Sequence, residues 1–520
     1  MPEQPPSFPF NLAGIALDRR QGLSRQLYQA LRLRILDGRL SSGTRLPASR
    51  DLAESLSISR NSVMRAYDQL YAEGFTDGRI GDGTYVAQLP SGEIALEKAS
   101  AKKLSTKVST GLSPGLPTGL STKSPTMPGI AASEVIHSPA LQLLQKHHLH
   151  TPLGGPPKAF RVGVPAFDLF PFSVWGKLHA AFWRKPEAHL LGYGDAAGDW
   201  RLRELIAVYL RSSRGLPCSA EQIVITSGAQ QAISLCAQLL LQAGDGVAVE
   251  NPGYRAAGHA FAITGAKLHG IAVDSEGMRS TDLAGSDCKL AYVTPSHQYP
   301  TGVVMSLARR LDLLAWAQRT QGWIVEDDYD GEYRYSGAPL APLAALDRHG
   351  RVLYVGTFGK IAFPALRLGY LVLPQGLVEP FSQRRALDMR HSEIGTQRVM
   401  AEFIAKGHFQ RHIRRMRRAA LSRRNALLAG WPVDLRGCEA MPKVVAGLHC
   451  AVRVESLARE QELVAKANSV GVEVNALSDY WLPESSEPVD NRAGLVLGFA
   501  AVPEVEIAEA LVKLRQIWQD

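Results

Sequence analysis

The stretch Gly356-Thr-Phe-Gly-Lys-Ile-Ala-Phe-Pro-Ala-Leu-Arg-Leu-Gly-Tyr370 decides how the larger part of this chain folds. It places a hydroxyl (Thr357), a lysine (Lys360) and an arginine (Arg367) on one glycine-rich turn. A lysine amine forms an imine with an aldehyde, and a hydroxyl and a guanidinium bind phosphate by charge-assisted hydrogen bonds. The turn therefore predicts a site for pyridoxal phosphate, with the imine on Lys360.

A second part of this site precedes the turn, in residues 222–241. The β-branched run 222–226 predicts a strand, and the apolar spacing that follows the glycine turn predicts a helix. Unpaired N–H groups and the positive dipole end at the start of a helix favour an anion. We expect the backbone at Gly228 and Ala229 to bind the phosphate.

Acidic residues end a further apolar strand, in Gly322-Trp-Ile-Val-Glu-Asp-Asp-Tyr-Asp330. The ends of strands are the usual place for ligand groups in an open α/β sheet. Asp327 would pair with the pyridine nitrogen and keep it protonated, and Tyr329 would hydrogen-bond the ring hydroxyl. Asp328 remains an alternative to Asp327, because the two residues are adjacent.

Two more loops follow predicted strands. Glu250-Asn-Pro-Gly-Tyr254 would lay the Tyr254 ring against the cofactor, and His297-Gln-Tyr-Pro-Thr-Gly302 forms a fifth loop on the same side. Each motif alone is explained as well by solvated side chains, a helix cap or a packed aromatic ring. Five such loops in one chain favour the cofactor site.

In the order of these motifs, roughly residues 156–520 resemble the fold-type I enzymes that include the aspartate aminotransferases. The resemblance implies an α/β fold with a mainly parallel sheet, and a homodimer with sites at the subunit interface. It implies cofactor contacts from Gly228, Ala229, Tyr254, Asp327, Tyr329, Thr357, Lys360 and Arg367. It also implies that Tyr193 reaches the phosphate bound by the other subunit.

The chain departs from that group at two positions. Tyr299 stands where those enzymes usually have the asparagine that contacts the ring hydroxyl. Val496 stands where they have the arginine that clamps the substrate carboxylate, and Arg492 is out of register with it. Losing this clamp removes much of the substrate positioning that turnover needs. The departures favour sensing over catalysis.

The first 90 residues predict a separate unit of three helices and a hairpin. The first helix contains residues 27–35, the second begins at a Ser49 cap, and the third begins at a Ser59 cap. The third helix carries an apolar stripe of Val63, Ala66, Tyr67 and Leu70. Two short strands, 75–79 and 84–87, follow. This order is typical of a winged helix-turn-helix, an α+β unit.

The third helix of such a unit enters the major groove of DNA. Arg60 and Asn61 would reach base edges, while Arg50 and Ser62 would bind phosphates. The predicted DNA contacts are Ser49, Arg50, Ser59, Arg60, Asn61, Ser62, Arg65 and Gly83. Acids nearly balance the arginines of this segment, so a solvated helical face is the alternative.

The runs Leu46-Pro-Ala-Ser-Arg-Asp-Leu-Ala53, Ser59-Arg-Asn-Ser-Val63 and Gly81-Asp-Gly-Thr-Tyr-Val86 look like a GntR-type winged helix. Such a domain ahead of an aminotransferase-like domain resembles the MocR/GabR family of bacterial transcription regulators. The resemblance implies a regulator that binds double-stranded DNA and senses pyridoxal phosphate, a small amine or an amino acid. Two alternatives are an active aminotransferase with an appended DNA-binding domain, and an empty dimerisation scaffold.

Length and composition agree with this organisation. The 520 residues are enough for a small and a large domain, and the net charge of +9 suits a nucleic-acid partner without requiring one. We expect a winged helix in residues 1–88, a flexible linker in 89–157 and the aminotransferase-like domain in 158–520. The five cysteines lack metal-type spacing, and no apolar run is long enough for a membrane. We therefore expect no metal and a cytoplasmic protein.

Overall fold

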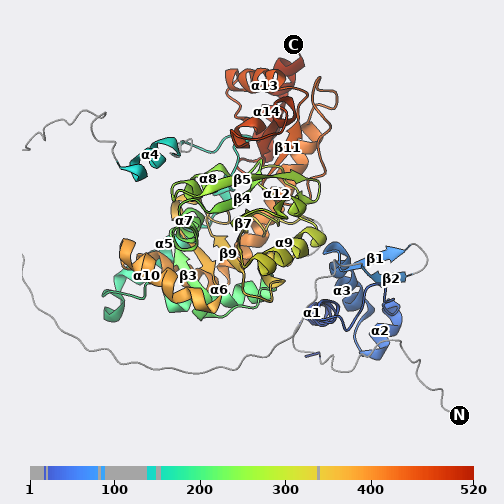
Figure 1. Ribbon diagram of the computed structural model, residues 1–520, viewed down its shortest axis with the longest axis vertical. Helices are drawn as coiled ribbons and strands as arrows, with labels where there is room; N and C mark the ends of the chain where they lie inside the picture. Colours follow the sequence, from blue (N-terminus) through green and yellow to red (C-terminus); the bar gives the residue numbers. More distant parts are fainter. Residues whose placement is uncertain are drawn as a thin grey trace, which may run out of the picture.

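The computed structural model describes residues 17–18, 22–79, 83–87, 138–147, 154–335 and 340–519 of the chain. It contains two folded units (Figure 1), which we call the winged-helix domain (22–79 and 83–87) and the large domain (154–335 and 340–519). Most of the expected linker, and the tip of the expected wing at 80–82, lie outside the described residues. The described part of the linker contains helix α4 (Pro139–Lys146).

The winged-helix domain has the three helices and the hairpin that its sequence predicts. They are α1 (Leu23–Leu36), α2 (Ser49–Ser55), α3 (Arg60–Ala72), β1 (Thr76–Arg79) and β2 (Gly83–Val86), with β1 and β2 antiparallel. The predicted stripe of α3 is buried in the core. Ser59 caps α3, since its hydroxyl accepts a hydrogen bond from the N–H of Ser62 at 3.1 Å.

The predicted cap of α2 is wrong by one residue. Ala48 is the N-cap, and Ser49 is the first residue of the helix. Ala48 has an extended backbone (φ −59°, ψ 144°), so the chain enters the helix only after it. The Ser49 hydroxyl instead accepts a hydrogen bond from Arg60 Nε at 3.2 Å.

Within the described residues, the large domain is built on a mostly parallel sheet with the strand order β3-β10-β9-β8-β7-β4-β5-β6. The strands are β3 (Ile223–Thr226), β4 (Gly246–Asn251), β5 (Lys267–Asp274), β6 (Gly277–Met278), β7 (Cys288–Val293), β8 (Trp323–Asp327), β9 (Val352–Thr357) and β10 (Gly369–Val372). The strands β6 and β10 run in the opposite direction to the other strands of this sheet. The predicted mainly parallel α/β architecture is confirmed.

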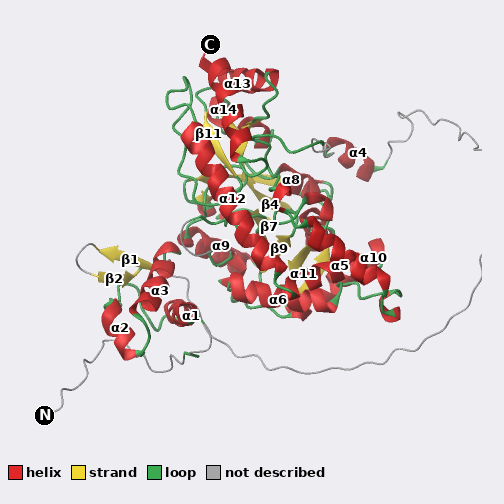
Figure 2. Cartoon of the chain, turned by 180° about the vertical axis from the view of Figure 1, so that it is seen from behind, coloured by secondary structure: helices red, strands yellow, loops and turns green. Residues whose placement is uncertain are grey.

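Helices cover both faces of this sheet (Figure 2). They are α5 (Phe172–Arg184), α6 (Trp200–Ser213), α7 (Ala229–Leu240), α8 (Arg255–Ala262), α9 (Leu307–Thr320), α10 (Val378–Met389), α11 (Ile394–Ala405) and α12 (His408–Gly430). Alternate residues of one strand enter different cores: Ile223 and Ile225 pack with α5, α6 and α11, and Val224 packs with α7 and α8. Both faces are apolar because both are covered.

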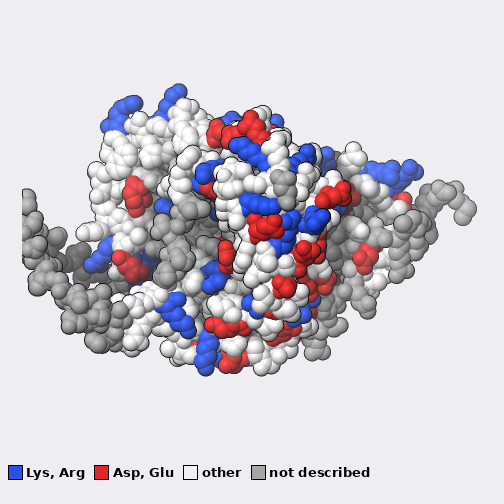
Figure 3. All heavy atoms as spheres, turned by 90° about the horizontal axis from the view of Figure 1, so that it is seen from above, with Lys and Arg blue, Asp and Glu red and all other residues white. Residues whose placement is uncertain are grey.

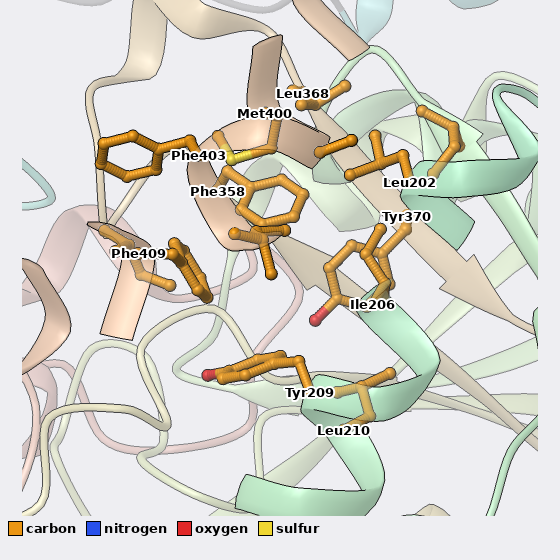
Figure 4. Packing of buried hydrophobic residues seen from close by; sticks show 14 of the residues in the cluster. Leu202, Ile206, Tyr209, Leu210, Phe358, Leu368, Tyr370, Met400, Phe403 and Phe409 are labelled. Atoms are coloured by element: carbon orange, nitrogen blue, oxygen red, sulfur yellow. The ribbon is translucent and has the colours of Figure 1, made fainter. Parts of the chain in front are cut away.

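The first of these cores supports the turn that decides the fold. Phe358, between Thr357 and Lys360, is buried against Phe409 and Tyr370 (Figure 4). The rings meet at 5.7 Å and 5.6 Å between centroids, within the range of favourable aromatic pairs. This packing fixes the backbone from which Lys360 projects.

A smaller antiparallel sheet with its own helices lies at the C-terminal end of the chain. It contains β11 (His449–Arg453), β12 (Asn475–Ala476) and β13 (Gly494–Gly498) in the order β11-β13-β12, with α13 (Leu457–Ser469) and α14 (Glu504–Gln519). Single 3₁₀ turns connect the larger elements: η1 (Phe167–Leu169), η2 (Ala188–Leu190), η3 (Ala220–Gln222), η4 (Ser280–Leu283), η5 (Leu343–Ala345), η6 (Pro364–Leu366), η7 (Gln375–Leu377), η8 (Leu477–Tyr480) and η9 (Asp490–Arg492).

The winged-helix domain packs against the large domain. Leu307 at the start of α9 and Leu346 after η5 are buried together with the core of the winged-helix domain. Arg32 of α1 donates a hydrogen bond to the carbonyl oxygen of Ala345 at 3.0 Å. Throughout the described ranges, no helix combines the length and the apolar character that a membrane crossing requires.

Candidate cofactor site and DNA-binding surface

A cavity of about 160 Å³ lies where the predicted loops meet, at the ends of β3, β7, β8 and β9. Its lining residues are Gly228, Ala229, Gln230, Tyr254, Tyr292, Thr294, Tyr299, Asp327, Tyr329, Thr357, Gly359, Lys360, Pro364, Arg367 and Leu368. Eight of the nine predicted cofactor contacts are in this set, and Tyr193 is not.

Lys360 is half-buried and lines this cavity. Its Nζ donates a hydrogen bond to the carbonyl oxygen of Gly163 at 2.7 Å. Burial lowers the pKa of the Lys360 amine, although the nearby carboxylates of Asp330 and Asp327 oppose this shift. A lower pKa increases the neutral fraction of the amine, and the neutral form is the nucleophile that attacks an aldehyde.

Asp327 presents a buried, unsatisfied oxygen. Its side chain is only 4% exposed, and Oδ2 accepts a hydrogen bond from the Tyr292 hydroxyl at 2.7 Å. Oδ1 has no hydrogen-bond partner in the described part of the chain. A buried acceptor without a donor is costly, so this oxygen fits a protonated ring nitrogen.

Asp328, the alternative to Asp327, does not line the cavity. Successive residues of a strand point to opposite faces, and Asp328 accordingly faces the other side of the sheet. There it forms a buried ion pair with Arg214 and accepts a hydrogen bond from the Tyr354 hydroxyl at 2.6 Å. The structure thus brings Asp327, and not its neighbour, to the site.

The groups predicted to bind phosphate converge at the start of α7. Gly228 is the N-cap, with φ +93°, and a Cβ atom there would lie 3.3 Å from Arg367 Nη2. Only glycine adopts this conformation readily and leaves the cavity open. Arg367 Nη2 donates a hydrogen bond to the Ser227 carbonyl oxygen at 2.7 Å. A helix start, a guanidinium and the Thr357 hydroxyl therefore fit a phosphate group.

Aromatic rings form another part of the cavity wall. Tyr254 meets Tyr299 edge to face, with centroids 5.6 Å apart at 87°. Tyr299 also meets Tyr329 edge to face at 5.8 Å. The Tyr329 hydroxyl donates a hydrogen bond to the His297 carbonyl oxygen at 2.9 Å, which fixes its position. A flat heteroaromatic ring suits walls of this kind.

Sequence reasoning missed Tyr292 and Thr294 as cavity residues, although it predicted their strand. Leu290 and Tyr292 face the same core as α7. Thr294 is two residues further on and therefore falls on the same side. The alternation along this segment is the signal that would have identified both residues.

Tyr193 lies outside the cavity of its own chain. Its side chain is 90% exposed, and its ring meets the edge of His391 at 6.0 Å. Its contact with the phosphate of another subunit stays a prediction.

Among the described residues, neither Val496 nor Arg492 provides a carboxylate clamp at the cavity. Val496 is completely buried in β13, opposite Ala451. Arg492 donates hydrogen bonds to the backbone oxygens of Ser485 and Glu487. Of the described residues that line the cavity, only Lys360 and Arg367 carry positive charge.

Four carboxyl groups, of which three are buried and one is half-buried, make the stability of the cofactor-free protein depend on pH. Burial raises the pKa values of Glu250, Glu326, Asp327 and Glu332 to about 7. The unfolded chain releases these protons at about pH 4, so the folded state binds more protons between about pH 4 and pH 7. The stability that these groups contribute is therefore full below about pH 4 and is lost as the pH rises through 7.

We expect Asp327→Asn, which keeps an acceptor for Tyr292, to reduce the loss of stability between about pH 5 and about pH 8. Urea unfolding of the cofactor-free wild type and variant at both pH values measures this. An equal loss in the two proteins would show that Asp327 is already ionised at the lower pH.

The predicted DNA-binding surface lies at the start of α3. Arg60, Asn61 and the nearby Arg50 are exposed. The Ser59 and Ser62 hydroxyls are hydrogen-bonded to each other at 2.9 Å. Arg65 is exposed and lines a cavity of about 550 Å³ between the two domains.

Sequence reasoning missed an arginine beside the wing, Arg45, which lies between α1 and α2 and forms an isolated bridge with Tyr85. A Cβ atom at Gly83, where φ is +121°, would lie 3.1 Å from Arg45 Nε. Arg45 also stands over the Tyr85 ring, at 6.0 Å from its centroid. An arginine beside a wing strand is suited to contact the DNA backbone. Its position just before the GntR-like run is the signal that could have identified it.

Net charge alone does not identify the DNA-binding surface, because acids nearly balance the arginines of the first 90 residues. Acidic and basic side chains are interspersed on the face shown in Figure 3. The assignment of DNA binding therefore depends on the arrangement of α2, α3 and the hairpin.

Comparison with known proteins identifies both domains. Residues 23–86 match the model of the bacterial regulatory proteins of the gntR family. Residues 171–467 match the model of aminotransferase class I and II.

Two relatives align with nearly the whole chain. The probable rhizopine catabolism regulatory protein MocR of Rhizobium meliloti is 34% identical over 494 residues, which are 95% of this chain and 93% of the relative. The pyridoxine biosynthesis transcriptional regulator PdxR of Corynebacterium glutamicum is 30% identical over 490 residues, which are 94% of each chain.

Solved structures resemble the large domain. Kynurenine aminotransferase of Pyrococcus horikoshii has a TM-score of 0.63 and 28% identity, over 75% of this chain and 96% of that chain. The large domain therefore has the fold of the aminotransferases, and the cofactor implied by this fold is pyridoxal phosphate, which the cavity residues fit. The chain belongs to the MocR family of HTH-type transcription regulators, in which a GntR-type DNA-binding domain precedes an aminotransferase class I and II domain.

Proposed function

We propose that this protein is a cytoplasmic transcription regulator whose affinity for its operator depends on the occupancy of the pyridoxal phosphate site. One observation carries the proposal: a cavity lined by eight of the predicted cofactor contacts and an exposed recognition helix occur in one chain, and the described residues that line the cavity include no clamp for a substrate carboxylate. Retaining the cofactor residues while losing the substrate residue favours sensing over turnover.

The cavity residues have distinct parts in this proposal. Pyridoxal phosphate supplies an aldehyde that joins a primary amine and a ring that withdraws electrons. Lys360 would hold the cofactor covalently, Asp327 would keep its ring nitrogen protonated, and Tyr254 and Tyr329 would position the ring. Thr357 and Arg367 would hold the phosphate with the backbone of Gly228 and Ala229.

The effector that these residues favour is the cofactor itself, or a simple amine that reacts at its aldehyde. Lys360 and Arg367, the cations that line the cavity, both serve the cofactor in this assignment. An amino acid would have to bring its carboxylate to a wall without a free positive charge, which is costly in a buried site. The regulation of pyridoxine biosynthesis by the relative PdxR supports the first possibility.

We also propose that the protein acts as a homodimer. Two recognition helices would then occupy two half-sites of one operator, as in other helix-turn-helix dimers. Tyr193, exposed outside its own cavity, would complete the phosphate site of the other subunit.

An active aminotransferase is the second candidate. The lowered pKa of Lys360 favours it, because a neutral amine can also move protons during turnover. In that case the winged-helix domain would localise the enzyme or control its gene.

One titration separates the two candidates. The cofactor-loaded protein is mixed with a panel of amino acids and amines, while its absorption spectrum and the release of keto acid are recorded. We expect less than one keto acid per site, together with a change of about tenfold in DNA affinity between cofactor-free and loaded protein, within the usual range of coupling. Keto acid released over many turnovers, with unchanged DNA affinity, would make the protein an enzyme.

A further inference from the structure

The winged-helix domain contacts the large domain with the end of its recognition helix. Gly74 and Phe75 follow α3, and with Leu307 and Arg310 of α9 they line a common cavity. A Cβ atom at Gly74 would lie 3.3 Å from Leu307 Cβ. The exposed DNA-facing residues stand at the other end of the same helix, about 20 Å away at 1.5 Å per residue. A shift at the contact would therefore tilt the DNA-facing end.

Strand β8 connects the cofactor cavity with this contact. Its residues alternate between the two faces of the sheet: Asp327 faces the cavity, while Glu326 and Asp328 face the opposite side. Glu326 is completely buried and accepts hydrogen bonds from the N–H groups of Leu343 and Ala344, both at 2.7 Å. These two residues begin η5, whose last residue, Ala345, accepts the hydrogen bond from Arg32.

Two buried arginines, Arg214 and Arg310, form a second connection between the cofactor cavity and the winged-helix domain. Arg214 pairs with Asp328 and donates to the Ser296 hydroxyl at 3.1 Å, and Arg310 donates to the Pro295 carbonyl oxygen at 2.8 Å. Both arginines thereby hold the loop that leads to Tyr299 in the cavity wall.

The same arginines also face the winged-helix domain. Arg214 lines the cavity between the domains together with Arg32 and Glu73, and Arg310 interacts electrostatically with Glu73. Glu73 is the C-cap of α3 and accepts a hydrogen bond from the Tyr28 hydroxyl at 2.6 Å. Its charge therefore lies where α1, α3 and the large domain meet.

We propose that this contact, formed by Arg32 and Glu73 against η5, Arg214 and Arg310, is the surface through which the cofactor site controls the recognition helix. The inference rests on the proposed function and adds the route of regulation to it. Asp327, which would hold the protonated ring nitrogen of the cofactor, is one residue from both Glu326 and Asp328. The charge balance of these adjacent carboxylates then changes, and with it their hold on η5 and Arg214. Occupancy of the cofactor site would thus change how α1 and α3 pack against the large domain.

Two variants in the winged-helix domain test this route without altering any residue that lines the cofactor cavity. Arg32→Ala removes the hydrogen bond to Ala345, and Glu73→Gln removes the charge near Arg310 while keeping the side-chain volume. Arg39→Ala is the matched control, because it removes a positive charge from a side chain that is 65% exposed and whose ion pair, in the described part of the chain, is with Asp37 of its own loop.

The measurement is the ratio of DNA affinities with and without pyridoxal phosphate, by fluorescence anisotropy of the full chain. The probe is a duplex selected from a random-sequence pool with loaded wild-type protein. We expect a ratio of about tenfold in wild type and Arg39→Ala, and a ratio below about threefold in Arg32→Ala and Glu73→Gln. All four proteins should show the same absorption of bound cofactor.

The possible failures are distinct. If both interface variants keep the wild-type ratio, this route is wrong while the proposed function stands. If the wild type itself binds no cofactor, or binds it without any change in DNA affinity, the proposed function fails and the route fails with it.

Hydrogen exchange provides a readout that needs no DNA. Cofactor should change the protection of the Leu343 and Ala344 amides in wild type, and unchanged protection would overturn the route.

Discussion

Lys360→Ala is expected to abolish covalent binding of pyridoxal phosphate and the cofactor response of DNA binding together. Lys360 is the only lysine that lines the cavity among the described residues. Without its amine the cofactor keeps its phosphate contacts but loses its covalent bond. A ligand present at a hundred times its Kd stabilises a protein by about 2.7 kcal/mol, and most of this stabilisation should disappear.

Absorption spectra, thermal unfolding with and without cofactor, and fluorescence anisotropy with a DNA duplex measure these effects. Basal DNA affinity should stay within about twofold of the cofactor-free wild type. Lys360 and the DNA-facing residues lie in different domains, and substitutions at distant sites have largely independent effects. Lys406→Ala is the matched control, since Lys406 is exposed and pairs with Glu402 within one helix. A variant that retains the full cofactor response would remove Lys360 from the mechanism.

Arg60→Ala should have the opposite effect, with DNA binding lost and the cofactor site intact. Arg60 is the first residue of α3, and its side chain is exposed. Within the domain it donates a hydrogen bond to the Ser49 hydroxyl. An arginine that reads a base edge contributes about 1–3 kcal/mol of discrimination, so affinity for the selected duplex should fall by about tenfold to a hundredfold. The absorption of bound cofactor should not change.

Competition between the selected duplex and random DNA shows whether Arg60 reads bases. A base contact predicts a smaller specificity ratio for Arg60→Ala, whereas a phosphate contact predicts an equal loss on both duplexes and a shallower salt dependence. Arg39→Ala removes the same charge from an exposed site in the domain and should lower both affinities only slightly. A fall in cofactor binding with Arg60→Ala would contradict the separation of the two functions.

Much of the fold could be predicted, because its signals are local. The stripe Val63, Ala66, Tyr67 and Leu70 follows the period of a helix, so it predicted both α3 and its buried face. Ser59 predicted the start of that helix, since its hydroxyl satisfies an N–H group two or three residues on. Ser49 misled for the same reason. The hydroxyl was suitable for a cap, but the backbone of Ala48 placed the helix start one residue earlier.

The candidate site was predictable where a short motif contains the functional groups that a cofactor requires. The turn that contains Thr357, Lys360 and Arg367 holds an amine, a hydroxyl and a guanidinium within a few residues, and Gly228 precedes a helix start. These groups meet in the cavity because each follows a strand of one sheet, and the ends of parallel strands share an edge.

The sequence by itself determined the two domains, the strand-end loops and the residue types that suit a pyridoxal phosphate site. The tertiary structure decided which of two adjacent aspartates faces the cavity, because the face of a strand residue depends on where its sheet lies. It also decided that Arg214 and Arg310 connect the back of β8 with the winged-helix domain. Arg214, Asp328 and Glu73 are far apart in the chain, and only folding brings their charges to one boundary, where burial makes each interaction strong.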